Sequence, residues 1–198
     1  MGRVHALVAM SRPDQIALIL AVLAAGVLLG LTRPSSSPGA AVLVATIIVV
    51  GAAIAAHLVN EAADAETDGR TQRTAFSGGS GALAASHLTP AVPLTVGLGA
   101  AALTAVATLM AWASGALPGP AATILLVGLI GGLAYSLPPV AAMRRGWGEP
   151  LNALLGGLLL PLSGVAVVVG SVGSADVLAF LPFTFVSLAS VLATAWPD

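Results

Sequence analysis

The sequence predicts an all-α fold, a bundle of transmembrane helices lying side by side in a lipid bilayer. Hydrophobic residues make up 58% of the 198 residues, whereas Asp, Glu, Lys and Arg make up only 8%. A soluble domain carries about a quarter charged residues, so this chain has too few to cover a surface that faces water. The apolar runs also reach about 20 residues, the length that a helix needs to cross a bilayer.

Six apolar runs of this length occur, separated by segments that are polar or rich in Gly and Pro. The predicted spans are residues 14–32, 40–60, 91–113, 120–138, 151–171 and 177–196. None alternates apolar and polar residues with a period of two, which argues against a β-barrel. Pro138 and Pro139 are expected to end the fourth helix. The first run is expected to be retained as a membrane helix, since no cleavage site with a soluble domain follows it.

The arginines orient the predicted bundle. With six spans, three pairs fall on one side of the membrane: Arg3 and Arg12, Arg70 and Arg73, and Arg144 and Arg145. Arg33 alone falls on the other side. Because loops rich in Lys and Arg stay in the cytoplasm, we expect the N-terminus and the loops at 61–90 and 139–150 to be cytoplasmic. The predicted location is the inner (plasma) membrane, spanned several times.

Composition also excludes several classes of function. The chain has no Cys, so disulfides, thiolate metal sites and Cys nucleophiles are excluded. The net charge is −1, with 7 basic and 8 acidic residues. Such a chain has no basic field to attract nucleic acid, so no nucleic-acid partner is expected.

Charged residues concentrate after the second apolar run. Asn60, Asp64 and Asp68 are spaced by four, so on one continuous helix they would share a face. Glu61 lies on the same side by the same arithmetic. Carboxylates in such a row repel one another unless a cation lies between them. Carboxylate and amide oxygens suit Mg²⁺, which also binds substrate phosphates, so the sequence predicts a Mg²⁺ site with a cytoplasmic position.

Two neighbours of this row receive simpler interpretations. Glu66 points away from the row, and we expect a solvated surface charge there. His57 is interpreted as a polar residue that faces the interior of the bundle.

The row Asn60, Asp64 and Asp68 resembles the first aspartate-rich motif of the UbiA superfamily of intramembrane prenyltransferases. In that family an Asp often follows the Asn directly, whereas this chain has Glu61 at that position. Two further segments are similar to family segments, and the resemblance runs through the whole chain in helix order. One is Arg73-Thr74 with the Gly-rich stretch 77–81, and the other is 135–149, which includes Tyr-Ser-Leu-Pro-Pro and Arg-Arg-Gly-Trp-Gly-Glu. Quinone-type and chlorophyll-type members carry similar stretches. The motif of CDP-alcohol phosphotransferases fits the spacing poorly.

The resemblance implies an enzyme that transfers a polyprenyl group from polyprenyl diphosphate to an aromatic acceptor in the membrane. A naphthoquinone precursor is favoured, and chlorophyll-type, haem and lipid-ether acceptors stay open. By this resemblance, Asp64 and Asp68 hold Mg²⁺ against the diphosphate, assisted by Asn60 and Glu61. Arginines would clamp the diphosphate oxygens. Tyr135 would either stabilise the allylic cation through its ring or serve as an aromatic anchor at the membrane interface. The expected clamp comprises Arg70, Arg73, Arg144 and Arg145.

The resemblance also implies a longer protein. UbiA-type enzymes have nine helices and a second aspartate-rich motif at the end of the sixth. Residues 1–198 would then be a single transmembrane domain with six helices of nine, inactive alone. Asp198 would be the first acid of the second motif and a further metal ligand.

A second class of function stays open, namely a transporter or channel subunit with an acidic cation site. Acids within a membrane serve ion pathways as well as enzymes. In this chain the acids lie at a helix end beside arginines. That position favours phosphate chemistry over an ion pathway through the middle of the membrane.

Overall fold

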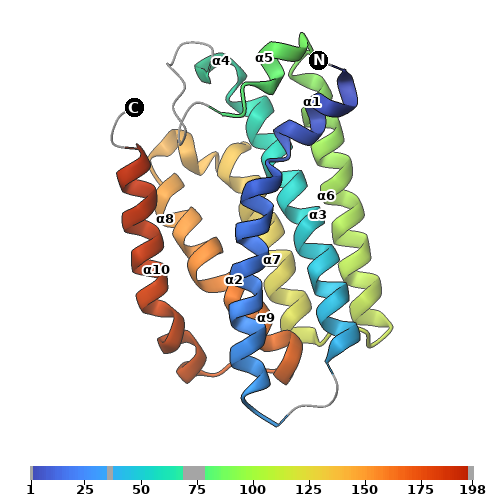
Figure 1. Ribbon diagram of the computed structural model, residues 1–198, viewed down its shortest axis with the longest axis vertical. Helices are drawn as coiled ribbons and strands as arrows, with labels where there is room; N and C mark the ends of the chain where they lie inside the picture. Colours follow the sequence, from blue (N-terminus) through green and yellow to red (C-terminus); the bar gives the residue numbers. More distant parts are fainter. Residues whose placement is uncertain (1, 35–37, 69–78, 196–198) are drawn as a thin grey trace.

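The computed structural model describes residues 2–34, 38–68 and 79–195, without the side chains of Asp68, Thr194 and Ala195. Every regular element in these residues is a helix (Figure 1). Six helices are long and apolar enough to cross a membrane, so the predicted multi-span bundle is confirmed. They are α1–α2 (Arg3–Met10 and Pro13–Leu31), α3 (Gly39–Ala63), α6 (Ala91–Ala113), α7 (Gly119–Ser136), α8–η2–α9 (Gly148–Asn152, Ala153–Leu159 and Leu160–Val169) and α10 (Ser174–Ala195).

The helix ends follow from local sequence. Arg12 has a left-handed backbone (φ 52°) and Pro13 opens α2, which separates α2 from the short helix α1. The fourth span ends at Ser136, just before Pro138, as expected. The fifth span contains a π-helical segment, η2, directly before Pro161. Pro161 has no N–H to donate to the carbonyl of Gly157 in the preceding turn, which accounts for irregular hydrogen bonding there.

The short elements mark one end of the bundle, which we call the Asp64 end. It carries α1, α4 (Ala65–Asp68), α5 (Ala82–Ser86) and η1 (Ala142–Arg145), together with the C-terminal end of α10 (Figure 1). The C-terminal ends of α2, α6 and α9 lie at the opposite end. The first helix, α1, and the end of the last helix, α10, therefore lie at the same end of the bundle, as an even number of spans requires.

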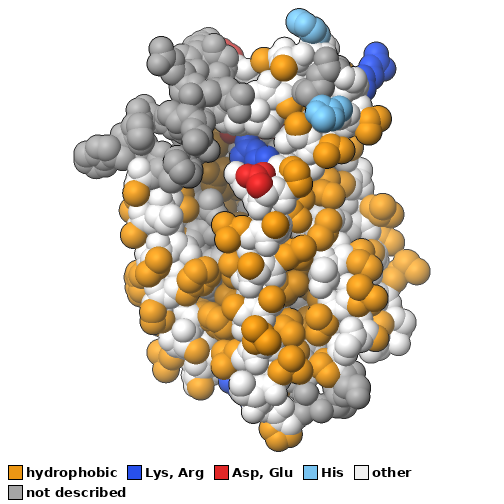
Figure 2. All heavy atoms as spheres, in the orientation of Figure 1, with side chains coloured by type: hydrophobic (Ala, Val, Ile, Leu, Met, Phe, Trp, Pro, Cys, Tyr) orange, Lys and Arg blue, Asp and Glu red, His pale blue; other side chains and the backbone are white. Residues whose placement is uncertain are grey.

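Hydrophobic side chains cover the flank of the bundle, as expected of a surface that faces lipid (Figure 2). Its interior is packed through small residues. A Cβ on Gly26 of α2 would lie 1.9 Å from the carbonyl oxygen of Pro161, and one on Gly164 of α9 would lie 2.6 Å from that of Leu23. Only glycine allows backbones to approach this closely, which is the usual basis of helix packing in membranes.

An ion pair joins two spans at the opposite end of the bundle. Arg33, just after α2, donates a hydrogen bond to Asp176 in the first turn of α10. Asp176 is buried and also accepts a 2.8 Å hydrogen bond from the backbone N–H of Gly173. The hydrogen bond with Asp176 raises the pKa of Arg33, so the guanidinium stays charged and links α2 to α10.

Candidate functional site

A cavity of about 310 Å³ lies between α2, α3, α7 and the α8–η2–α9 unit. Its polar lining residues are Arg12, Gln15, His57, Asn60, Tyr135, Asn152 and Ser163. The remaining wall is Gly, Ala, Val, Ile and Leu, contributed mainly by α3, α7 and η2. The volume falls within the range of small-molecule sites. The cavity thus combines an apolar wall with a few polar groups, several of which belong to the Asp64 end.

Asn60 and Asp64 meet at the Asp64 end of the bundle, where Asn60 lines the cavity and Asp64 does not. The Nδ2 atom of Asn60 lies 2.7 Å from Oδ2 of Asp64 and 3.2 Å from the hydroxyl of Ser136 on α7. Asn60 is on the cavity wall. The spacing of four between Asn60 and Asp64 therefore brings an amide and a carboxylate together, as the sequence predicts.

The expected helical face does not extend to Asp68, so that part of the prediction is wrong. Helix α3 ends at Ala63, and Asp64 follows with φ −94° and ψ 1°. Asp68 belongs to the separate short helix α4, and its side chain is outside the described residues. The break coincides with a cap from another part of the chain: Nη2 of Arg144 donates a 2.8 Å hydrogen bond to the carbonyl of Ala63. A cation at a helix C-terminus is favourable because it satisfies the last carbonyls and complements the dipole.

Glu61 has partners that the sequence interpretation missed. Its side chain is 2% exposed, and Oε2 lies 3.2 Å from Nη2 of Arg12. The backbone N–H of Ser80 donates to the same oxygen over 3.2 Å, and the Ser80 hydroxyl donates to Oε1. Glu61 thus ties α3 to the start of α2 and to the Gly-rich stretch. A metal role for Glu61 stays a prediction, and it would compete with these contacts.

Of the four arginines expected to bind diphosphate, the two that the structure describes do not line the cavity. Arg144 and Arg145 are exposed on η1, where Arg144 caps α3. Arg70 and Arg73 lie outside the described residues, as does Asp198. Of the charged residues that the structure describes, only Arg12 lines the cavity. From the sequence, Arg12 was interpreted only as a marker of topology. Its position next to Pro13, at the start of an apolar run, could also have indicated an arginine at the end of the bundle interior.

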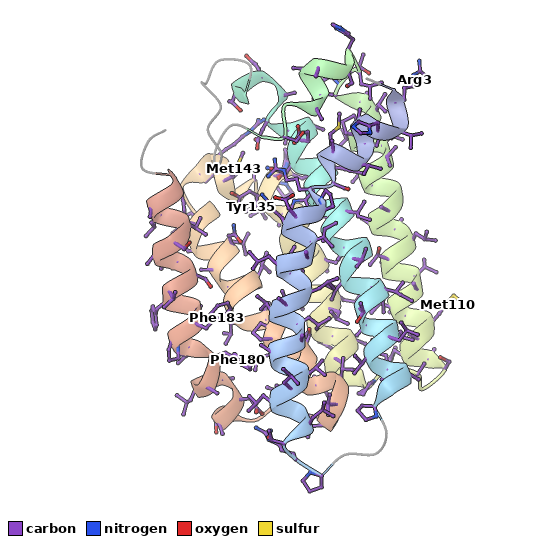
Figure 3. All side chains as sticks on the ribbon, viewed as in Figure 1. Arg3, Met110, Tyr135, Met143, Phe180 and Phe183 are labelled. Atoms are coloured by element: carbon purple, nitrogen blue, oxygen red, sulfur yellow. The ribbon has the colours of Figure 1, made fainter. Side chains whose placement is uncertain are left out.

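Tyr135 lines the cavity near its polar end and packs on the segment that follows α7. A Cβ on Gly148 would lie 3.3 Å from Cε2 of Tyr135 and 3.0 Å from Cα of Met143. Figure 3 shows Tyr135 and Met143 near each other at the Asp64 end. Gly148 therefore lets the tyrosine ring lie close to the η1–α8 connection, on the same side of the bundle as Asn60.

Other polar cavity residues come from helices that the sequence interpretation treated as apolar spans. Gln15 and Asn152 are exposed at the start of α2 and in α8, and the nearby segment η2 contributes Leu155 and Gly156 to the wall. π-Helical segments are rare and recur at functional sites. Gln15 and Asn152 each lie in the first turns of an apolar run, and a polar residue in that position is a sign, readable from the sequence, of a side chain that faces the interior of the bundle.

The oxygen donors at the Asp64 end fit a Mg²⁺ ion that is held partly by a substrate. Nδ2 of Asn60 donates a hydrogen bond to Oδ2 of Asp64, so a Mg²⁺ ion bound by both residues would replace this contact and use the amide oxygen Oδ1. Within residues 2–34, 38–68 and 79–195, no group of three or more His, Asp or Glu side chains gathers that could hold a metal alone. Mg²⁺ commonly uses one or two carboxylates together with substrate phosphates and water, so a pair of donors is compatible with that mode.

Comparison with known proteins gives no relative: no family model matches the chain, and neither a curated protein nor a solved structure does.

Proposed function

We propose that this protein is a Mg²⁺-dependent prenyltransferase of the membrane, which transfers a polyprenyl group from polyprenyl diphosphate to an aromatic acceptor. One observation carries the proposal. Asn60, which donates a hydrogen bond to Asp64, lies at the polar end of a cavity whose remaining wall is apolar and extends into the bundle. A diphosphate with a long hydrocarbon chain has the same division between an anionic head and an apolar tail.

The charges near the cavity suit the diphosphate head. Arg12 lines the cavity at its polar end. Arg144 donates a hydrogen bond to the carbonyl of Ala63, the residue directly before Asp64. Arginine binds phosphate oxygens through its forked N–H donors. Bound Mg²⁺ would neutralise negative charge on the diphosphate, with Asn60 and Asp64 as its protein ligands.

The reaction itself needs little from the protein beyond positioning and exclusion of water. The allylic C–O bond breaks and its electron pair leaves with the diphosphate. A ring carbon of the acceptor forms the new C–C bond, and the ring then loses a proton. Tyr135 presents an aromatic ring at the cavity wall, where it would favour the developing cation. The surrounding apolar side chains keep water from the cation.

The acceptor we propose is a quinone precursor, with a naphthoquinone ring favoured by the resemblance of 135–149 to quinone-type family members. By the positive-inside rule, the Asp64 end would face the cytoplasm of a plasma membrane. Both substrates would then meet at the cytoplasmic face, where a soluble diphosphate head and a lipid-embedded chain can be bound together.

A cation transporter is the competing class, and the cavity lining disfavours it. The charged residue on the described wall is Arg12, which repels cations, and the described acids of the spans lie near helix ends. An ion pathway instead needs polar or acidic groups through the depth of the membrane. Vesicles containing the protein would take up Mg²⁺ or Mn²⁺ if this class were correct.

Turnover by matched variants tests the proposed reaction. Membranes that express the encoding gene are supplied with labelled farnesyl diphosphate and a hydroxynaphthoate acceptor, with Mg²⁺ or with EDTA. We expect Mg²⁺-dependent prenylated product, and a loss of roughly 100-fold or more in Asp64→Ala because a charge-stabilising ligand is removed. Glu66→Ala, which changes an exposed acid two residues away, should retain activity. Equal turnover by Asp64→Ala and the parent would refute the role of Asp64.

A further inference from the structure

His57 presents an unpaired polar atom to the cavity. It lies on the wall, three residues before Asn60 on α3. Its Nε2 atom is buried and makes no hydrogen bond to any described residue. A buried polar atom without a partner is unfavourable because it has lost its hydrogen bonds to water, and such atoms are rare in native proteins. Contacts among residues 2–34, 38–68 and 79–195 therefore leave this nitrogen unsatisfied.

The other polar residues of the wall do not raise the same question. The Ser163 hydroxyl donates a 2.6 Å hydrogen bond to the carbonyl of Leu160. Gln15 and Asn152 are exposed, so water can satisfy them. Nε of Arg12 is buried and unpaired, but its guanidinium is already engaged through Nη2 with Glu61. Among the described residues, the buried Nε2 atom of His57 thus stands out as a polar atom of the wall without a hydrogen-bond partner.

The position of His57 fixes what it can reach. Residues three apart on a helix lie on neighbouring positions of the same side, separated by about 4.5 Å along the axis. Because α3 ends at Ala63, His57 is farther from the Asp64 end than Asn60 and closer to the apolar wall. If Asn60 and Asp64 hold the diphosphate head group, His57 lies beside whatever occupies the cavity next to that head group.

We propose that Nε2 of His57 hydrogen-bonds a hydroxyl or carbonyl oxygen of the aromatic acceptor and so positions its ring beside the allylic carbon. This inference rests on the proposed prenyl transfer and names the residue that recognises the second substrate. A ring of two fused six-membered cycles is otherwise apolar and suits the Gly, Ala, Val, Ile and Leu residues that line the rest of the cavity. The single polar contact then fixes which edge of the ring faces the diphosphate.

The test measures binding of two ligands that differ by one hydroxyl, 1-naphthol and naphthalene. The protein encoded by the gene is placed in nanodiscs, and saturable binding above that of empty nanodiscs is recorded. The parent should bind naphthol about 10-fold more tightly than naphthalene, because naphthol satisfies the buried nitrogen. His57→Phe keeps an aromatic ring without the nitrogen, so the two ligands should bind equally. His5→Phe, at an exposed histidine of α1, should keep the parent's preference.

Two further readouts keep the inference falsifiable. If His57→Phe does not fold, the parent alone decides: equal affinity for naphthol and naphthalene would overturn the hydrogen bond. In turnover, His57→Phe should raise the KM for a hydroxynaphthoate about 10-fold and leave the KM for farnesyl diphosphate within about twofold. If His57→Phe loses the preference for naphthol but the parent protein shows no prenyl transfer, the proposed function is refuted and the hydrogen bond is not. Prenyl transfer with an unchanged naphthol preference in His57→Phe would refute the inference alone.

Discussion

Glu61 shows how one carboxylate organises the Asp64 end. It is buried between Arg12 and Ser80, which come from segments that precede and follow it in the chain. Without those partners a buried carboxylate is strongly unfavourable. The contacts bring the start of α2, the end of α3 and the stretch before α5 together around the polar end of the cavity. Glu61 is therefore placed to support the site through packing and charge.

Glu61→Ala should destabilise the protein by about 3 kcal/mol, because it leaves Arg12 without its partner in a partly buried position. The measurement is thermal or denaturant unfolding in detergent micelles. Glu66→Ala removes an exposed carboxylate from the neighbouring helix and serves as the matched control, with little expected change.

A double-mutant cycle separates the ion pair from other effects of the substitution. If the pair accounts for the loss, Glu61→Ala should cost far less in an Arg12→Ala background. An equal cost in both backgrounds would contradict the importance of the Arg12–Glu61 pair.

At the scale of single residues, local spacing predicted some contacts and missed others. The Asn60–Asp64 hydrogen bond follows from a spacing of four on a helix, so the sequence predicted their proximity. The pairing of Arg12 with Glu61 spans 49 residues and depends on how α2 and α3 pack. No pattern in a single sequence encodes such a contact. The end of α3 before Asp64 was missed for a similar reason, since its cap comes from Arg144.

At the scale of elements, the packing of α2 against α9 depends on glycine. Gly26 and Gly30 are four residues apart on α2, and a Cβ on Gly30 would lie 2.8 Å from Cβ of Val168. Helices associate in lipid through close packing, since apolar burial gives no advantage over lipid contact. The two glycines therefore set the distance between these spans, which also form part of the cavity wall.

Gly26→Leu should destabilise the bundle by roughly 3 kcal/mol, since its side chain meets the backbone of Pro161 and overpacks the contact. Gly99→Leu on α6 is the matched control, because a Cβ there has no neighbour within 4 Å. Unfolding in micelles measures both variants. A Gly26→Leu protein as stable as Gly99→Leu would show that α2 and α9 do not pack closely.

The sequence predicted elements by hydropathy, with boundaries a few residues from those observed. The fifth span was expected at 151–171 and extends over Gly148–Val169. Its π-helical segment η2 was not predicted, because a run of Ala, Leu and Gly is equally compatible with α-helix. Only the position of Pro161 offered a local cause, and proline in a membrane helix more often leaves an ordinary kink.

At the scale of the molecule, the arginines and the fold agree. Arg12 and Arg144 contact the Asp64 end of α3, and Arg33 contacts α10 at the opposite end. Hydropathy and arginine positions thus predicted both the number of spans and which loops share a side. The cavity could not be predicted from either pattern, since it arises from the way α2, α3, α7 and α9 are spaced.

Reporter fusions test the orientation of the bundle. A reporter fused after residue 116, between α6 and α7, should appear on the outer side of the plasma membrane. One fused near residue 80, in the connection before α5, should appear on the inner side if the positive-inside rule orients the arginine-rich end toward the cytoplasm. Alkaline phosphatase and green fluorescent protein report the two sides. Both fusions on one side would contradict the six-span topology.

The central claim is that the cavity beside Asn60 and Asp64 binds a prenyl diphosphate together with Mg²⁺. The most direct test is calorimetric binding of farnesyl thiodiphosphate, an inert analogue with a C–S bond, to the protein in nanodiscs. We predict that Mg²⁺ tightens binding at least about 10-fold, or about 1.4 kcal/mol, and that Asp64→Ala abolishes this effect. Binding that is unaffected by Mg²⁺, or a Mg²⁺ effect that persists in Asp64→Ala, would contradict the claim.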